Sequence, residues 1–153
     1  MTDAKKPSVT KNLSILIVED SDAGIAFLRQ ELKGIGFEHI VMAKNGAEGL
    51  EKARESARIG VPFELVIADI NMPKMDGLQM VERFKEEDAL KNIPVLVVSA
   101  ERDMGKVLKA INLGVKQYII KPYSRNDLKD KIISIFNQMG KDSVVEIRSK
   151  EGE

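Results

Sequence analysis

Five polar residues in this sequence combine the types that handle phosphoryl chemistry, and each lies at or just past the end of a short apolar run. They are Glu19, Asp20, Asp69, Ser99 and Lys121. A carboxylate can attack phosphorus and form an aspartyl-phosphate. A lysine ammonium, a hydroxyl and a metal ion can together stabilise the charge of a phosphoryl group. The residue types therefore predict a phosphoryl-transfer site, provided that the fold brings them together.

Three carboxylates in one pocket repel one another, which leaves two alternatives for Glu19, Asp20 and Asp69. Either some of them bind protons, or a cation lies among them. Hard carboxylate oxygens with no His or Cys nearby favour Mg²⁺, with Mn²⁺ as a substitute. Asp69 follows the central strand of the predicted sheet, so we assign it the role of nucleophile. An isolated Asp at this position would more often be a turn residue.

The elements that must position these residues form an alternating pattern. Apolar runs predict five strands, at 13–18, 39–43, 65–68, 93–98 and 116–120. Helical spacing predicts five helices, at about 22–36, 45–57, 76–88, 101–112 and 124–139. Three of them begin with a capping residue that has a polar partner three positions on: Asn45 with Glu48, Asp76 with Gln79, and Ser124 with Asp127,. Strict alternation with short connections indicates an α/β fold, with a parallel sheet and helices on both of its faces.

The predicted strand order gathers the polar strand ends into one place. In the order 2-1-3-4-5, the second strand lies at the outer edge, and it ends in Ala43-Lys44 without an acid or hydroxyl. The other four strands end in residues that could do chemistry. Parallel strands place all these ends at one edge of the sheet, which is where open α/β sheets bind ligands.

In this order and spacing, the motifs resemble the receiver domain of two-component response regulators, of the single-domain CheY-like type. The resemblance covers about 13–139, and it implies the doubly wound, flavodoxin-like (βα)5 fold. It rests on Glu19-Asp20, on Asp69 with Asn71-Met72-Pro73-Lys74-Met75-Asp76-Gly77, on Ser99-Ala100, and on Tyr118 with Lys121-Pro122 three positions on.

The resemblance implies that Asp69 is the phosphoacceptor and that Mg²⁺ lies beside it. Asp20 and Asp69 would bind the metal directly, and Glu19 would act through water. The backbone carbonyl of Asn71 would complete the metal site. No other cofactor is expected.

The resemblance also implies which residues respond to the phosphoryl group. Lys121 would pair with the phosphoryl oxygens, and Ser99 would be the switch hydroxyl that moves toward them. Tyr118 would be the aromatic residue that turns inward on activation. The Lys121-Pro122 bond would be cis, which a prolyl bond permits at low cost.

A protein of this type would be a stand-alone response regulator in a two-component phosphorelay. A histidine kinase or phosphotransfer protein would donate the phosphoryl group. The surface of the helix at 101–112, the strand at 116–120 and the last helix would then bind a downstream protein. We expect a phosphoacceptor switch rather than an enzyme, with only self-directed phosphoryl transfer and slow autodephosphorylation, and we expect a monomer.

Two other functions fit parts of the pattern. A Mg²⁺-dependent aspartyl-phosphate phosphohydrolase needs an acid or base near its nucleophile. Enzymes resembling haloacid dehalogenases place a second Asp two positions on, where this chain has Asn71. A flavodoxin-like cofactor binder would have a phosphate loop rich in Gly, Ser and Thr after its first strand. Here that loop is Glu19-Asp20-Ser21-Asp22, which repels phosphate in the absence of a metal.

Composition narrows the remaining function classes. The chain has 153 residues, enough for one domain, and its 24 basic and 24 acidic residues balance,. This balance provides no electrostatic basis for binding nucleic acid or an anionic membrane. There is no Cys, and no apolar run approaches the roughly 20 residues that span a bilayer. We expect a cytoplasmic protein with a flexible lead-in at 1–12, a receiver domain at 13–139 and a disordered tail at 140–153.

Overall fold

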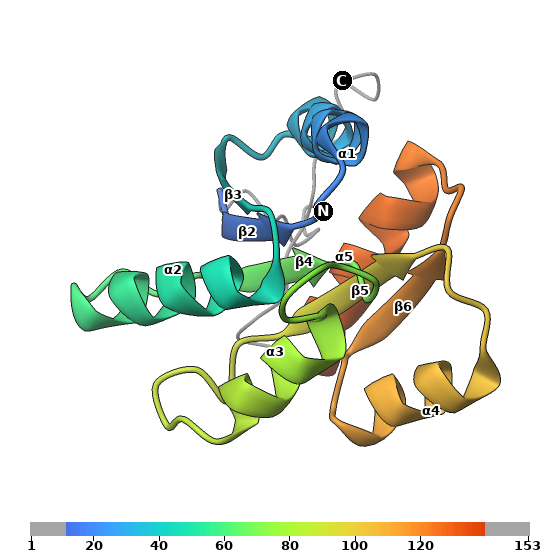
Figure 1. The fold of residues 1–153 in the computed structure, drawn as a ribbon. Helices are drawn as coiled ribbons and strands as arrows, with labels where there is room; N and C mark the ends of the chain where they lie inside the picture. Colours follow the sequence, from blue (N-terminus) through green and yellow to red (C-terminus); the bar gives the residue numbers. More distant parts are fainter. Residues whose placement is uncertain (1–11, 140–153) are drawn as a thin grey trace.

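The computed structural model describes residues 12–139, and its sheet has the predicted order. Five strands lie in the order β3-β2-β4-β5-β6, and every neighbouring pair is parallel. Counted along the chain, this is the order 2-1-3-4-5. The predicted α/β architecture is therefore confirmed, with β4 at the centre of the sheet and β3 at its outer edge (Figure 1).

Strands and helices alternate without exception in the described part of the chain. The strands are β2 (Ser14–Val18), β3 (His39–Ala43), β4 (Leu65–Ala68), β5 (Val95–Ser99) and β6 (Gln117–Ile120). The helices are α1 (Asp22–Ile35), α2 (Gly46–Arg58), α3 (Gly77–Lys85), α4 (Met104–Asn112) and α5 (Arg125–Gln138). The largest differences from the predicted bounds are the end of α3 and the start of α4, each about one turn inside its prediction.

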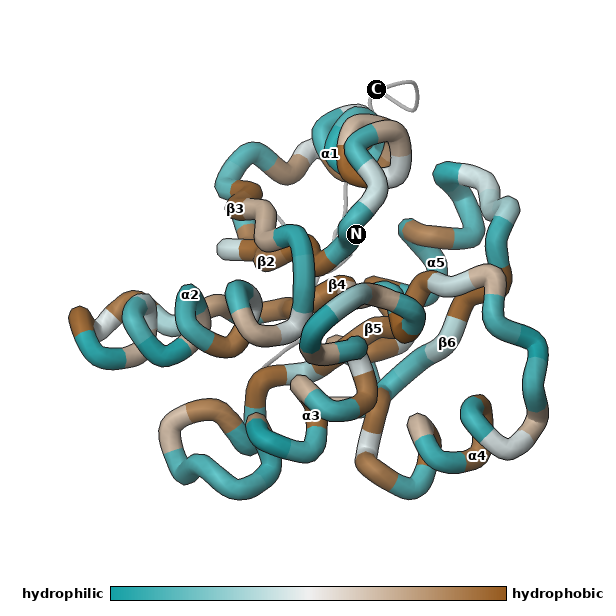
Figure 2. The backbone as a smooth tube through the Cα atoms, in the orientation of Figure 1, coloured by the Kyte–Doolittle hydropathy of each residue, from teal (hydrophilic) through white to brown (hydrophobic). Residues whose placement is uncertain are grey.

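The sheet lies between two layers of helices, and an apolar cluster fills the interface on each side. One side of the sheet packs against α1 and α5 through residues such as Leu32, Ile132 and Phe136. The other side packs against α2, α3 and α4, where Phe84 and Ala110 are buried. Figure 2 shows the strands at the centre of the fold as mostly hydrophobic, as expected for strands that are covered on both faces,.

Side-chain caps set where the helices begin. Two reciprocal capping boxes that the sequence predicts are present, Asp76 with Gln79 and Ser124 with Asp127. The predicted start of α4 at 101 is wrong, because Asp103 is its N-cap and accepts hydrogen bonds from the backbone of Gly105 and Lys106. The three residues before this cap form a loop that bears on the site described below.

The two ends of the chain lie outside the part that the structure describes. The predicted lead-in at 1–12 falls there except for Asn12, and the predicted tail at 140–153 falls there entirely. Among residues 12–139, no helix combines the length and apolar character needed to cross a membrane.

Candidate functional site

The sheet's hydrogen bonds continue past the strand ends and hold the functional residues in register. The backbone N–H of Asp69 donates to the carbonyl of Val18 at 3.0 Å, which places Asp69 beside Glu19. The backbone N–H of Lys121 donates to the carbonyl of Ser99 at 2.9 Å. Residues far apart in the sequence thereby meet at the carboxyl edge of the sheet, as the predicted strand order requires.

Lys121 bridges two carboxylates at this edge. Its ammonium nitrogen lies 2.9 Å from Oε1 of Glu19 and 3.0 Å from Oδ2 of Asp69. The two carboxylate side chains are 7% and 11% exposed, against 30% for Lys121. The lysine therefore supplies positive charge where two largely buried carboxylates would otherwise repel each other.

Burial and pairing act against each other at this bridge. Burial raises the pKa of the Glu19 carboxyl, and the hydrogen bond from Lys121 offsets only part of this effect. Burial alone would lower the pKa of Lys121, but its hydrogen bonds to Glu19 and Asp69 outweigh that effect and raise it. The ammonium therefore remains charged at neutral pH, which is the state needed to bind a phosphoryl oxygen.

The predicted metal ligands do not form a closed cage. Asp20 is exposed at the start of the β2–α1 loop, next to the buried Glu19. Within residues 12–139, no three His, Cys, Asp or Glu side chains converge closely enough to form a ready-made metal site. The carboxylates of Glu19, Asp20 and Asp69 still suit Mg²⁺ chemically, because this hard ion prefers oxygen ligands and keeps several waters.

The β4–α3 loop folds back tightly over Asp69 and brings Asn71 to it. The backbone N–H of Asn71 lies 3.4 Å from Oδ1 of Asp69. At Gly77 the chain passes so close to Asp69 that an added Cβ would lie 2.1 Å from the Asp69 carbonyl oxygen. Glycine at this position is therefore a steric requirement of the loop that carries the predicted Asn71 carbonyl ligand.

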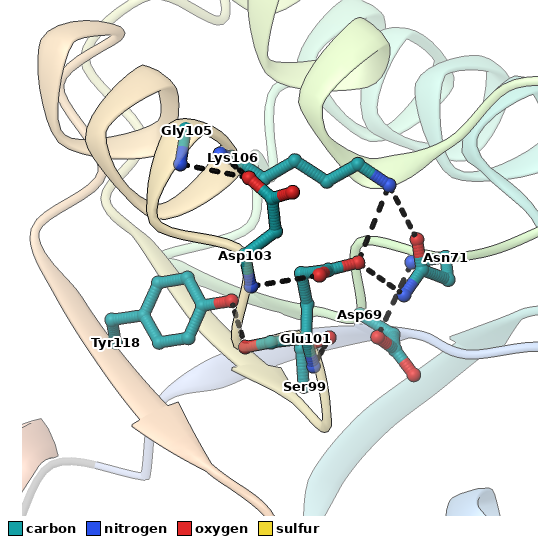
Figure 3. A network of polar contacts seen from close by, with 8 residues as sticks. All are labelled: Asp69, Asn71, Ser99, Glu101, Asp103, Gly105, Lys106 and Tyr118. Carbon is teal, nitrogen blue, oxygen red and sulfur yellow. Dashed lines mark hydrogen bonds and ion pairs between the residues drawn. The ribbon is translucent and has the colours of Figure 1, made fainter.

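Ser99 and Tyr118 lie on the two neighbouring strands β5 and β6. Ser99 is fully buried, and its hydroxyl accepts a hydrogen bond from the backbone N–H of Glu101 at 3.1 Å. The Tyr118 hydroxyl donates to the carbonyl of Glu101 at 3.1 Å. Burial raises the pKa of Tyr118. Both predicted switch residues thus contact the same residue, Glu101, in the β5–α4 loop (Figure 3). The Lys121-Pro122 peptide bond is cis.

Sequence reasoning missed two residues beside this site, Glu101 and Lys106. Oε1 of Glu101 accepts hydrogen bonds from Nδ2 of Asn71 at 3.1 Å and from Nζ of Lys106 at 3.3 Å. A signal for Glu101 existed, because it lies two positions after Ser99 just as Asn71 lies two positions after Asp69, on adjacent strands. The sequence contains no comparable signal for Lys106, which reaches the loop from the first turn of α4.

A cavity of about 460 Å³ opens beside the Lys121 bridge. Its lining is largely apolar and includes Phe27, Leu28 and Tyr123, and Asp69 and Lys121 also line it. The Phe27 and Tyr123 rings meet edge to face, 5.4 Å apart. The phosphoacceptor candidate therefore has an apolar wall on the side of α1.

This chain matches one domain family and is similar to known proteins over most of its length. The response regulator receiver domain family matches residues 15–133. Chemotaxis protein CheY-3 of Vibrio cholerae is 30% identical over 131 residues, which cover 86% of this chain and 97% of the relative. Chemotaxis protein CheY1 of Helicobacter pylori is 32% identical over 120 residues, which cover 78% of this chain and 94% of the relative.

A solved structure shows the same likeness in three dimensions. The crystal structure of a CheX-CheY-BeF3-Mg²⁺ complex from Borrelia burgdorferi contains a chain with a TM-score of 0.72 and 32% identity. The alignment covers 80% of this chain and 87% of that one. The receiver-domain resemblance of the sequence is thus confirmed independently by family, by relatives and by fold.

Proposed function

The chain belongs to the response regulator receiver domain family, and we propose that it works as a phosphorylation switch with Asp69 as its phosphoacceptor. The observation that carries this proposal is the Lys121 ammonium, which lies within hydrogen-bond reach of both Asp69 and Glu19. It can bind an oxygen of a phosphoryl group on Asp69 without leaving its place in the fold. Receiver domains of this CheY-like kind are signalling switches in two-component systems, and we extend that role to this chain.

The transfer step needs an oxygen of Asp69 and a phosphorylated donor. That oxygen forms a bond to phosphorus while the donor's own bond to phosphorus breaks, and the electron pair leaves with the donor. Lys121 offsets the charge on the phosphoryl oxygens. We propose that the physiological donor is a phosphohistidine, on a histidine kinase or a phosphotransfer protein, and that the protein's own catalysis is limited to this transfer and a slow autodephosphorylation.

Mg²⁺ would supply the further positive charge that the phosphoryl group needs. We propose that Asp20, Asp69 and the Asn71 carbonyl hold it, with Glu19 acting through water. The donor chemistry supports this assignment, as does the Mg²⁺ named for the similar complex from Borrelia burgdorferi. Lys121 contacts Oδ2 of Asp69, so Oδ1, which has a 3.4 Å contact with the Asn71 N–H, could bind the metal while the bridge stays in place.

The signal would leave through α4, β6 and α5. Ser99 and Tyr118 both contact Glu101 at the start of the loop before α4. Movement of the Ser99 hydroxyl toward a phosphoryl group would break its bond to the Glu101 backbone and loosen this loop. We propose that the remodelled surface then binds a protein target, by analogy with the CheX partner named for the similar CheY complex.

A phosphohydrolase remains the alternative function, and the geometry at Asn71 argues against it. The position two residues after Asp69, where haloacid-dehalogenase-like enzymes place an acid or base, holds Asn71, whose amide cannot take up a proton. Its amide nitrogen is also engaged with Glu101 at 3.1 Å. Rapid turnover of an aspartyl-phosphate would require a proton acceptor that this position lacks.

Labelling with a small phosphodonor tests the proposal directly. We expect acetyl phosphate with Mg²⁺ to add one phosphoryl group to the protein, detected by intact mass spectrometry. The group should be absent without Mg²⁺ and in the Asp69→Asn variant. Asp76→Asn is the matched control, because Asp76 lies in the same loop but caps α3. Labelling of Asp69→Asn to the wild-type level would refute the assignment of Asp69.

A further inference from the structure

Gly24 lies in the first turn of α1, where the backbone conformation does not require glycine. In the described part of the chain the glycines with positive φ are Gly36, Gly60 and Gly114, and Gly24 is not one of them. Glycine inside a helix is unfavourable relative to alanine, because it loses more backbone freedom on folding. The reason for a glycine at position 24 therefore lies in a neighbouring side chain rather than in the helix itself.

That neighbour is the side chain of Glu19. A Cβ added to residue 24 would lie 2.9 Å from Cδ of Glu19, 3.1 Å from its Oε1 and 3.2 Å from its Cγ. Non-bonded carbon atoms prefer separations of about 3.5–4.0 Å. An added methyl group would therefore overlap the Glu19 side chain from Cγ to the carboxylate, and one of the two would have to move.

Glu19 is poorly placed to move aside, because it is buried and both of its carboxylate oxygens are held. Oε1 accepts a hydrogen bond from Nζ of Lys121 at 2.9 Å, and Oε2 accepts one from the backbone N–H of Ser21 at 3.0 Å. A shift that makes room for a side chain at position 24 would lengthen at least one of these bonds. A buried carboxylate that loses a hydrogen bond is costly, since water does not replace the donor.

The contacts continue from Glu19 to the phosphoacceptor. The Lys121 ammonium that binds Glu19 also lies 3.0 Å from Oδ2 of Asp69. Gly24, Glu19, Asp69 and Lys121 all line the cavity beside the bridge. The space at Gly24 thus affects the position of Glu19, and through Glu19 the position of the cation beside Asp69.

We propose that Gly24 is a positioning residue: the absence of a side chain there lets the long Glu19 side chain reach Ser21 and Lys121 together. This contact in turn holds the Lys121 ammonium beside Asp69. The inference rests on the proposed function of Asp69 and adds to it a residue on α1. Positions 19 and 24 form a pair matched in size, in which the longer acid requires the smaller neighbour.

Melting temperatures in metal-free buffer test the packing of this pair. In the Glu19→Ala background the overlapping atoms are gone, so Gly24→Ala should raise the melting temperature by about 2–4 °C, the usual benefit of alanine in a helix of such a domain. In the wild-type background this gain should be absent or reversed. Glu19→Gln keeps the length of the side chain without its charge, and it should abolish the gain as well.

A control in the same helix measures the intrinsic difference between glycine and alanine. Ala26 is exposed in α1, so Ala26→Gly should lower the melting temperature by a similar amount in all three backgrounds. An equal gain from Gly24→Ala in the wild-type and Glu19→Ala backgrounds would show that residue 24 does not restrict Glu19, and would overturn the proposal.

The rate of labelling tests whether the pair positions Lys121. Intact mass spectrometry follows the reaction with acetyl phosphate at saturating Mg²⁺. We expect Gly24→Ala to slow labelling about tenfold, the effect of losing one hydrogen bond between charged groups, and Ala26→Gly to leave the rate unchanged. In Glu19→Ala, adding Gly24→Ala should change the rate less than about twofold, as for independent sites.

Two labelling results would contradict the proposal. A wild-type rate in Gly24→Ala would show that residue 24 does not affect the site. An equal slowing in the Glu19→Ala background would show that the added methyl group acts through the cavity and not through Glu19. Absence of any label on the wild-type protein would instead refute the proposed function of Asp69, whereas the melting temperatures would still decide whether Gly24 makes room for Glu19.

Discussion

The two sides of the site are built from similar residues but differ in how they are held. On one side, Lys121 pairs with Glu19 and Asp69, which lie 102 and 52 positions away in the sequence. Their carboxylate side chains are 7% and 11% exposed. On the other side, Asn71 and Glu101 on two loops hydrogen-bond to Lys106 in the first turn of α4. The Lys106 side chain is 49% exposed. One side is part of the packed sheet edge, and the other is a set of surface contacts on the loops before α3 and α4.

This difference shows how the residues that bind the phosphoryl group can stay fixed while the residues that respond to it can move. Buried ion pairs rearrange only at a cost, because each partner left alone has lost its hydration. Exposed ion pairs are worth little and exchange readily with water. The Lys121 side therefore keeps a constant electrostatic setting for Asp69, and the Lys106 side can change with the position of α4.

Breaking the Lys121 bridge should produce the largest effect on stability. Lys121→Met leaves Glu19 buried without its cation, and we expect it to lower the free energy of unfolding by about 2–3 kcal/mol. Lys106→Met, as the counterpart on the exposed side, should leave that free energy close to the wild-type value. Urea denaturation of both variants in metal-free buffer at neutral pH measures the difference. Equal losses in the two variants would contradict the comparison.

The pH dependence of folding stability should also depend on the Lys121 bridge. Burial raises the folded-state pKa of Glu19 above its ordinary value of 4.5. A raised carboxyl pKa means that its contribution to stability is present at low pH and is lost as pH rises through the folded-state pKa. Lys121→Met removes the contacts that lower this pKa, so its stability should fall more steeply than the wild type's above about pH 4.5. Melting temperatures from pH 4 to 8 in metal-free buffer, a range set by that pKa, test this sign.

The Ser99 hydroxyl lies between the two sides, and its removal should have an intermediate effect on stability. Ser99→Ala removes the acceptor for the Glu101 backbone N–H, which we expect to cost about 1 kcal/mol of stability. The variant should still accept phosphate on Asp69 but lose the response of the β5–α4 loop. Amide NMR of both states measures this in residues 101–123. The full wild-type pattern of shifts in Ser99→Ala would show that the hydroxyl is not the switch.

The smallest stability effect is expected at Asp20, on the exposed rim of the buried side. Asp20→Asn removes one of three neighbouring negative charges, so the metal-free protein should gain at most about 0.5 kcal/mol. The same change removes a proposed direct ligand and should weaken Mg²⁺ binding by at least about tenfold. Titration calorimetry measures the affinity, and Asp22→Asn is the control, because Asp22 begins α1 and pairs with Lys44 instead. Unchanged Mg²⁺ affinity in Asp20→Asn would remove that residue from the metal site.

The sequence by itself determined the fold and the identity of the residues at the sheet edge. The short runs that end in Asp69 and Ser99 predict buried parallel strands, because strands covered on both faces are apolar along nearly their whole length. The run before Lys121 is apolar only in its second half. Because the carboxyl ends of parallel strands lie at one edge of the sheet, Asp69, Ser99 and Lys121 come together there irrespective of the loop conformations. Capping signals at Asp76 and Ser124 depend only on local backbone geometry, and both were predicted correctly.

Only the tertiary structure decided which side chains pair with one another. Lys121 could have faced solvent, and its contacts to Glu19 and Asp69 depend on the loop geometry beyond β2 and β6. The first turn of α4 was misplaced because the Glu101 backbone and carboxylate are engaged outside the helix, by Ser99 and Asp103. Lys106 carried no signal at all, since a helix's periodicity shows which residues share a face but not which loop from another strand lies within reach of a flexible lysine.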